Sequence, residues 1–210
     1  MKKPLTKKRC PWADTHELLT TYHDEEWGVP VHDDQMLFEM LNLEGAQAGL
    51  SWLTVLKKRD AYRKAFKNFD AKKLVKFTEE MQAELMNNDG IIRNRLKIKA
   101  VVGNAKAYLT ILAAQKAAAK VNKMASKNED DLNSFSGAFD AYIWSFSNGK
   151  IISHTRRYEA IAISAVMSKD LLKRGFKFVG ATICFAYMQA IGMVNDHEKE
   201  CFCAKRKMVQ

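Results

Sequence analysis

The sequence predicts an all-α protein, and three observations lead to this fold class. The prolines, Pro4, Pro11 and Pro30, all lie near the N-terminus, so the commonest helix-breaking residue is absent from the remaining 180 residues. Apolar residues recur with the period of a helix in several segments. No segment alternates convincingly between apolar and polar residues, which is the pattern of a half-buried strand. We expect one compact helical domain spanning residues 1–210.

The first expected helix carries a carboxylate on its apolar face. Leu37, Met40 and Leu41 lie on the same side as Glu44, because residues three, four and seven apart stack along a helix. An isolated buried charge is costly, so a carboxylate kept out of water must be paired, neutralised or reserved for a ligand. The alternative for Glu44 is a buried side chain that capping or other hydrogen bonds satisfy.

Two further amphipathic helices are expected in the middle of the chain. A stripe of apolar residues at 74, 77, 81 and 85 ends at the turn-forming sequence NNDG, residues 87–90. A longer stripe lies between Arg93 and Leu112, with Lys and Arg residues on its other side. Residues 113–134 are small and polar, which predicts a helix end passing into an exposed loop. FDAYIWSF, residues 139–146, has strand-like composition but no partner strand, so we interpret it as a buried helix.

Residues 168–192 predict two helices joined by a tight hairpin. Ser168 can cap the first helix, and Gly175 can close it in a left-handed backbone conformation. The second helix is expected after Gly180, so free amides and the positive end of its dipole would point outward. Three basic residues add to this field: Lys173, Arg174 and Lys177. Such a hairpin fits a DNA phosphate; the alternative is an ordinary turn with solvated lysines.

Composition narrows the class of partner. Lys and Arg number 34 against 24 Asp and Glu, and the net charge of +10 favours a polyanion such as nucleic acid. A cationic surface that serves only solubility is the alternative. No apolar stretch approaches the length of a membrane span, and the basic N-terminus is not followed by a secretory signal. We therefore expect a cytoplasmic protein with no membrane partner.

Four residues near the two ends of the chain are candidate metal ligands. In a reducing cytosol, cysteines serve more often as thiols or metal ligands than in disulfides. His197 and Cys201 are four residues apart and would share a face if this stretch is helical. Cys10 and His23 would complete a Cys2His2 set, which zinc holds tetrahedrally with no open position, as in structural sites. Cys203 could replace Cys201, and ordinary packed residues remain the alternative.

Five stretches of the chain resemble one family. They are CPW at 10–12, YHDEEWGVP at 22–30, LEGAQAGLSWLTVLKKR at 43–59, GIIRNRLKIKAVVGNAKAY at 90–108 and KRGFKFVGATICFAYMQAIGMVNDH at 173–197. In this order and spacing, the chain resembles the constitutive bacterial DNA-3-methyladenine glycosylases. These enzymes belong to the helix-hairpin-helix superfamily, and the resemblance covers nearly the whole chain.

The resemblance implies a fold, a metal and a DNA contact. It implies an all-α, helix-hairpin-helix DNA glycosylase fold in which Gly175, Lys177 and Gly180 belong to the hairpin that grips the DNA backbone. It also implies one structural zinc ion that joins the N- and C-terminal segments. By motif, the ligands of this zinc are Cys10, His23, His197 and Cys201.

The resemblance also implies a base pocket and an activity. The recognition carboxylate maps onto Glu44 and the aromatic walls onto Tyr22 and Trp52, with Trp12 adjacent. The expected activity of this monomeric enzyme is to flip 3-methyladenine out of duplex DNA and to hydrolyse its N-glycosidic bond, leaving an abasic site. The alternative from another class is a non-enzymatic, zinc-stabilised DNA-binding protein with the same hairpin.

This chain departs from the family pattern in three places. Leu19 stands where the family often has a second tyrosine, which alters one pocket wall. Related glycosylases use an aspartate after the hairpin, but we assign no catalytic role to Asp196, because its neighbour His197 is a candidate metal ligand. Residues 153–166 fit the family pattern poorly, so the resemblance assigns neither the lesion-side DNA contacts nor the range of substrates there.

Overall fold

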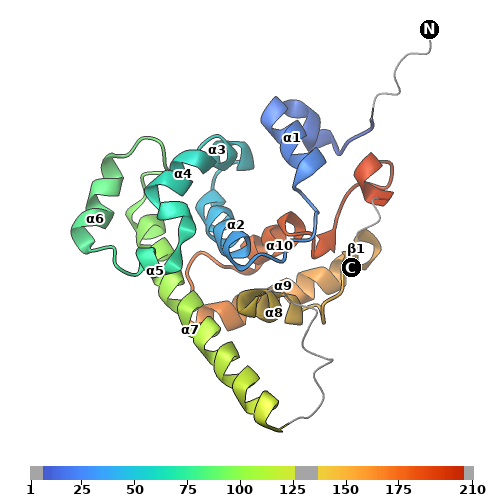
Figure 1. Ribbon diagram of the computed structural model, residues 1–210. Helices are drawn as coiled ribbons and strands as arrows, with labels where there is room; N and C mark the ends of the chain where they lie inside the picture. The colour runs from blue at the N-terminus through green and yellow to red at the C-terminus, as the bar shows by residue number, and fades with distance from the viewer. Residues whose placement is uncertain (1–6, 126–136, 206–210) are drawn as a thin grey trace.

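The computed structural model describes residues 7–125 and 137–205, and helices dominate both ranges (Figure 1). In chain order the helices are α1 (Glu17–Glu25), α2 (Asp34–Gln47), α3 (Trp52–Leu56), α4 (Arg59–Ala65), α5 (Ala71–Leu74), α6 (Glu79–Glu84), α7 (Arg95–Ala125), α8 (Ala138–Ser145), α9 (Arg157–Lys173) and α10 (Ala181–Ala190). Short 3-10 turns lie at Pro11–Thr15, Lys67–Phe69, Leu85–Asn87, His154–Arg156 and Phe202–Lys205. The strands β1 (Ile152–Ser153) and β2 (Val194–Asn195) form one short parallel pair. The predicted all-α class is confirmed.

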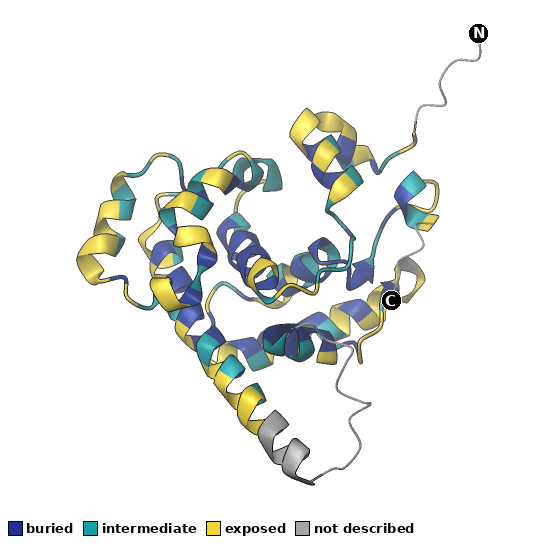
Figure 2. Ribbon diagram, in the orientation of Figure 1, coloured by how far each residue is buried: buried dark blue, intermediate teal, exposed yellow. Residues whose placement is uncertain are grey.

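Helix α2 is the buried centre of the molecule (Figures 1 and 2). All its residues from Leu37 to Ala46 are buried, because α2 packs against α3, α7, α8 and α10. Its N-terminus is fixed by Asp33, whose carboxylate accepts a 2.7 Å hydrogen bond from the Met36 amide. The predicted apolar face is therefore present, and the burial continues around the helix.

The hairpin between α9 and α10 forms as the sequence predicts. Gly175 has a φ of +97°, and its amide bonds the Leu172 carbonyl oxygen at 3.0 Å, which closes α9. Helix α10 begins at Ala181, directly after Gly180. The prediction that Ser168 caps the first helix is wrong, because α9 already begins at Arg157 and Ser168 is buried in its interior. Residues 160, 164 and 167 continue the buried face at helical spacing, and this periodicity outweighs the capping preference of serine.

The stripe at residues 74–85 is interrupted, which corrects the expectation of one helix. Helix α5 ends at Leu74 and α6 begins only at Glu79. The Thr78 hydroxyl accepts a 3.3 Å hydrogen bond from the Met81 amide, so Thr78 starts a new helix instead of continuing the old one. The turn after this region is confirmed, since the Asn88 side chain accepts a hydrogen bond from the Gly90 amide.

The later helices agree with the sequence. The helix predicted between Arg93 and Leu112 is α7, which continues to Ala125 and so takes in the first part of segment 113–134. Residues 126–134 of that segment lie outside the described residues. FDAYIWSF is helical and largely buried in α8. Within the described ranges, no helix combines the length and the apolar character needed to cross a membrane.

The N- and C-terminal segments meet beside α10. The Phe202 amide donates to the Lys8 carbonyl oxygen at 2.9 Å, and the Gly28 and Val31 amides donate to the carbonyl oxygens of Gln189 and Ile191. Strands β1 and β2 pair Ser153 with Asn195. These contacts bring residues from both ends of the chain to one place, next to the C-terminal part of α2.

Candidate functional site

A cavity of about 570 Å³ opens where these segments converge. Its walls come from the N-terminal segment, α1, the C-terminal part of α2, α3, the start of α9, α10 and the segment after β2. The lining residues include all four of the residues that the sequence predicts for base recognition: Trp12, Tyr22, Glu44 and Trp52.

Glu44 is the buried carboxylate of this cavity. Its side chain is only 3% exposed, and Oε2 has no hydrogen-bond partner among the described residues. Burial raises the pKa of Glu44 to about 8, because the ionised form loses its hydration and no cation compensates. In the absence of a ligand, Glu44 is therefore mainly protonated at neutral pH. A carboxyl group held in this state gains from a ligand that supplies a donor or a positive charge.

Aromatic rings form the walls around Glu44. The ring centroids of Tyr22 and Trp52 lie 5.2 Å apart, and Trp12 lies 6.4 Å from Tyr22. The Nε1 donor of Trp52 is buried without a hydrogen-bond partner among the described residues. Burial, together with the nearby Glu44 carboxyl, raises the pKa of Tyr22 well above its ordinary value, so the phenol stays neutral. The cavity thus combines flat apolar surfaces with one donor and one acceptor that have no partner.

Trp27 is a cavity residue that the sequence reasoning did not assign. Its ring lies 5.0 Å from that of Trp12 and 4.6 Å from that of His197, both edge to face. It therefore joins the aromatic wall to the Cys and His residues. Its place in YHDEEWGVP, the stretch that also holds Tyr22 and His23, was the available signal.

Buried polar contacts fix the end of α2 that carries Glu44. Lys97 donates to the carbonyl oxygens of Ala46 and Ala48 at 2.8 and 2.7 Å, which satisfies the C-terminus of α2 with a cation. The buried Arg59 donates to Glu39 on α2 at 2.9 Å and to Glu26 at the end of α1 at 2.5 Å. These contacts hold α1 and α2, and so the elements of Tyr22 and Glu44, in one arrangement.

The hairpin is joined directly to α2. Asn104 on α7 accepts a 2.8 Å hydrogen bond from the Lys177 amide and donates to Asn42 on α2 at 2.9 Å. A Cβ atom at Gly45 would lie 3.1 Å from the Cβ and carbonyl oxygen of Phe178, which is tighter than ordinary packing, so a side chain here would press on the hairpin. The sequence prediction of free hairpin amides does not hold at Lys177, whose amide is used internally. The Lys177 side chain, Gly175 and Gly180 are exposed, as a DNA contact requires.

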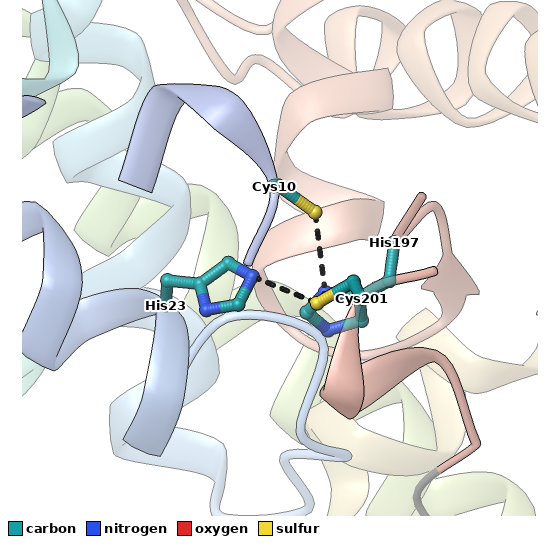
Figure 3. Close-up of side chains that lie close together, drawn as sticks. All are labelled: Cys10, His23, His197 and Cys201. Carbon is teal, nitrogen blue, oxygen red and sulfur yellow. Dashed lines mark hydrogen bonds between the residues drawn. The ribbon is translucent and has the colours of Figure 1, made fainter. Parts of the chain in front are cut away.

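Four Cys and His side chains converge as the sequence predicts (Figure 3). Cys10, His23, His197 and Cys201 are all buried, and their ligand atoms lie within 4.8 Å of one another. The Sγ–N distances are 3.3 Å from Cys201 to His23, 3.6 Å from Cys201 to His197 and 3.7 Å from Cys10 to His197. A tetrahedral zinc ion bound at ordinary lengths separates sulfur from nitrogen by about 3.5 Å. The side chains therefore fit such an ion.

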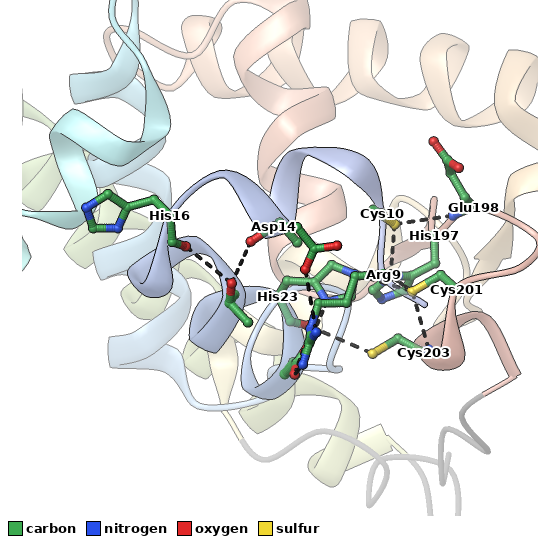
Figure 4. Close-up of polar contacts among 12 residues, drawn as sticks. Arg9, Cys10, Asp14, His16, His23, His197, Glu198, Cys201 and Cys203 are labelled. Carbon is green, nitrogen blue, oxygen red and sulfur yellow. Dashed lines mark hydrogen bonds and ion pairs between the residues drawn. The ribbon is translucent and has the colours of Figure 1, made fainter. Parts of the chain in front are cut away.

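The surroundings of these four residues also suit a metal (Figure 4). The Glu198 and Cys203 amides lie 3.4 Å from the sulfurs of Cys10 and Cys201. Nδ1 of His23 is 2.9 Å from an Asp24 oxygen, which leaves Nε2 facing the sulfur of Cys201. Hydrogen bonds from Arg9 lower the pKa of Asp24 to about 2, so this carboxylate remains ionised beside His23.

The helix on which the sequence argument for His197 and Cys201 depended is absent. Residues 196–201 form a turn, closed by a 2.8 Å hydrogen bond from the Cys201 amide to the Glu198 carbonyl oxygen. This turn also brings both side chains to the same point. Of the two alternatives for the fourth ligand, Cys201 faces the other three, whereas the Cys203 thiol lies 4.0 Å from the His23 carbonyl oxygen.

Comparisons with known proteins agree with this architecture. The model of the methyladenine glycosylase family matches residues 12–131 and 118–204. The DNA-3-methyladenine glycosylase of Haemophilus influenzae (strain ATCC 51907 / DSM 11121 / KW20 / Rd) is 44% identical over 93% of this chain and 97% of its own length. A crystal structure of 3-methyladenine DNA glycosylase I is 42% identical, with a TM-score of 0.77 over 93% of this chain and 99% of the other. A tyrosine-to-phenylalanine variant of such an enzyme, crystallised with 3-methyladenine, is 31% identical, with a TM-score of 0.76 over 96% of this chain and 99% of the other.

Proposed function

The chain belongs to the methyladenine glycosylase family, and we propose that it flips 3-methyladenine out of alkylated duplex DNA and hydrolyses its N-glycosidic bond. The product would be an abasic site, from which base excision repair proceeds. The observation that carries this proposal is a carboxyl group without a partner, Glu44, buried in an aromatic-lined cavity.

Glu44 recognises the base through charge and hydrogen bonding. 3-Methyladenine in DNA is a cationic nucleobase, and a nearby positive charge favours the ionised form of a buried carboxyl. Binding of the lesion would therefore lower the pKa of Glu44 from about 8 and release its proton. The resulting carboxylate accepts hydrogen bonds from the base edge, while Tyr22 and Trp52 stack on its faces.

Unmodified adenine lacks the positive charge that this cavity compensates. It would leave Glu44 protonated or place an ionised carboxylate in an apolar site without a counter-charge. A buried polar group without a partner costs about 1–3 kcal/mol, which corresponds to roughly tenfold to a hundredfold in affinity. The cavity thus selects the lesion when the base enters it.

Little acid catalysis is needed for the chemical step. The base already carries positive charge, so the glycosidic bond is weakened before the enzyme acts and the base leaves as a neutral molecule. The cavity orients the base. Water then attacks the sugar carbon as the bond to the base breaks, and the proton that this water loses passes to solvent. The proposed step forms no covalent lysine intermediate, so the enzyme would be a monofunctional glycosylase.

The hairpin would hold the DNA backbone. Gly180 precedes α10, a ten-residue helix whose first two residues are exposed, and Lys177 is exposed near this helix start. These groups favour a phosphate through hydrogen bonds and the helix dipole. Because Gly45 packs against Phe178, the hairpin and Glu44 stand at a fixed separation, which suits one flipped nucleotide of a bound duplex.

One zinc ion would hold the two ends of the chain together. Cys10, His23, His197 and Cys201 offer two sulfurs and two nitrogens at tetrahedral separations, and all four are buried. This set leaves no position for water or substrate, so the ion would serve structure alone. Trp12 and Tyr22 lie next to its ligands in sequence, so the ion would also support the aromatic wall. We propose that the protein acts as a cytoplasmic monomer.

The proposed function is tested with methylated DNA. The unmodified protein should release 3-methyladenine, whereas Glu44→Ala should impair release much more than it impairs binding to undamaged duplex. Glu84, an exposed carboxylate on α6, supplies the matched control, and Glu84→Ala should behave like the unmodified protein. The absence of release at any excess of unmodified protein would remove the enzymatic proposal and leave the non-enzymatic DNA-binding alternative. Equal loss of both properties in Glu44→Ala would contradict a role in recognition.

A further inference from the structure

An arginine at the rim of the cavity takes no part in the base recognition or in the chemical step proposed for this protein. Arg157 is the first residue of α9 and lines the cavity, and its side chain is 53% exposed. It lies in segment 153–166, whose sequence fits the family pattern poorly although the family model matches across it. The pairing of Ser153 with Asn195 between β1 and β2 sets the start of α9 beside the residues that follow β2.

Two contacts hold the Arg157 side chain at this rim. Nη1 donates to Oδ2 of Asp196, and the guanidinium lies 4.9 Å above the Phe185 ring. The same Asp196 oxygen accepts a 2.6 Å hydrogen bond from Gln189, and the Asp196 side chain is only 11% exposed. The partners of Arg157 are thus themselves fixed, so the guanidinium is oriented before any ligand arrives.

The guanidinium keeps donors for a further partner. Arginine has five N–H groups, and among the described residues Arg157 uses only Nη1 in a hydrogen bond, to Asp196. Nε and Nη2 therefore remain for an acceptor outside the protein. The fork of an arginine matches the two oxygens of a phosphate, so such an acceptor would be bound in a defined orientation.

We propose that Arg157 binds a backbone phosphate of the flipped nucleotide and positions the lesion in the cavity. This inference rests on the proposed function, because only a nucleotide that has left the duplex and entered the cavity places its own phosphates at the rim. Asp196 holds the guanidinium in place, and Arg157 in turn screens the phosphate from the Asp196 carboxylate. Arg157 is thus a positioning residue for the extrahelical nucleotide, distinct from the hairpin, which contacts DNA whether or not a lesion is present.

The test compares the salt dependence of binding to two duplexes of the same sequence, one of which carries a single tetrahydrofuran abasic-site analogue. Each phosphate contact contributes about 0.9 to the slope of log K against log salt concentration. Arg157→Gln should reduce this slope by about 0.9 on the analogue duplex only, and should weaken binding to that duplex about tenfold. Binding to the undamaged duplex should not change.

Arg156→Gln is the matched control. It removes the same charge one residue earlier, from a side chain that pairs with Glu159 at 2.5 Å and does not line the cavity. Its slopes should equal those of the unmodified protein on both duplexes. Arg157→Lys, which keeps the charge without the fork, should retain the slope with weaker binding. An unchanged slope for Arg157→Gln on the analogue duplex, or an equal change on both duplexes, would overturn the inference.

Repeating the measurement in an Asp196→Asn variant separates phosphate binding by Arg157 from neutralisation of the Asp196 carboxylate. If Arg157 only compensates that carboxylate, Arg157→Gln introduced into Asp196→Asn should have no further effect. If Arg157 binds phosphate, the slope should still fall by about 0.9 in this background. Release of 3-methyladenine by the unmodified protein is measured separately, so failure of the proposed function and failure of this inference are distinguishable.

Discussion

Replacing Glu44 by glutamine should make the protein more stable at high pH. Burial raises the pKa of Glu44 from 4.5 to about 8 in the folded protein. In acid, the carboxyl is protonated in both the folded and the unfolded chain, so it does not affect the pH dependence of folding. As the pH rises from 4.5 towards 8, the unfolded chain ionises while the folded protein keeps the proton. The wild-type protein therefore loses stability over this window, whereas glutamine has no proton to lose.

The size of the effect follows from these two values. Proton linkage costs the wild-type protein about 1 kcal/mol at about pH 5 and roughly 5 kcal/mol at about pH 9. The advantage of Glu44→Gln should therefore grow by about 4 kcal/mol over this interval. Such a change is large against a typical total stability of about 5–15 kcal/mol.

Urea unfolding of metal-loaded protein at several pH values measures this effect. Glu84→Gln, which changes a carboxylate already in water on α6, should follow the wild-type curve throughout. A constant stability difference between Glu44→Gln and wild type across the whole range would refute the reasoning. It would mean that Glu44 is ionised and compensated in the folded protein, so that the cavity holds no uncompensated carboxyl group for a cationic ligand.

Three further variants probe the metal cluster and the hairpin. Metal analysis should find about one zinc per chain. Cys10→Ala should lower the melting temperature by about 5 °C or more. An unchanged melting temperature would exclude a structural metal. Gly45→Ala should reduce DNA affinity and stability, because the added methyl group pushes Phe178 and the hairpin away from α2. Gly103→Ala, with open space around it, should preserve DNA affinity. Equal DNA affinities of these two variants would contradict the close approach of Gly45 and Phe178. Lys177→Ala should lower the salt slope by about 0.9 on damaged and undamaged duplex alike, and a lesion-dependent loss would contradict a backbone contact.

The parts of the fold that depend on long hydrophobic periodicity were predictable. The burial of α2 and the course of α7 follow from apolar residues at helical spacing. Local capping signals were less reliable, because serine and threonine prefer helix starts but also occur inside helices. Thr78 starts a new helix where the apolar stripe predicted one uninterrupted helix, while Ser168 lies buried inside α9. For Ser168, the buried face of α9 outweighed the capping preference.

The chemistry of the site was predictable where single residues carry it. The oddity of a carboxylate in an apolar run identified Glu44, and the rarity of Cys and His identified the four candidate ligands. Contacts between elements that are far apart in the chain gave no such signal in the sequence. Arg157 meets Asp196 only because β1 pairs with β2, and Lys97 reaches the end of α2 from another helix. A charged residue on the polar face of a helix has the same sequence signature whether it is solvated or buried against a carbonyl oxygen.

A crystal of this protein soaked with free 3-methyladenine would test the central claim most directly. The base should lie in the cavity with its polar edge within hydrogen-bond distance of the Glu44 carboxyl and its ring between Tyr22 and Trp52. A base bound elsewhere, or one that makes no contact with Glu44, would contradict the account.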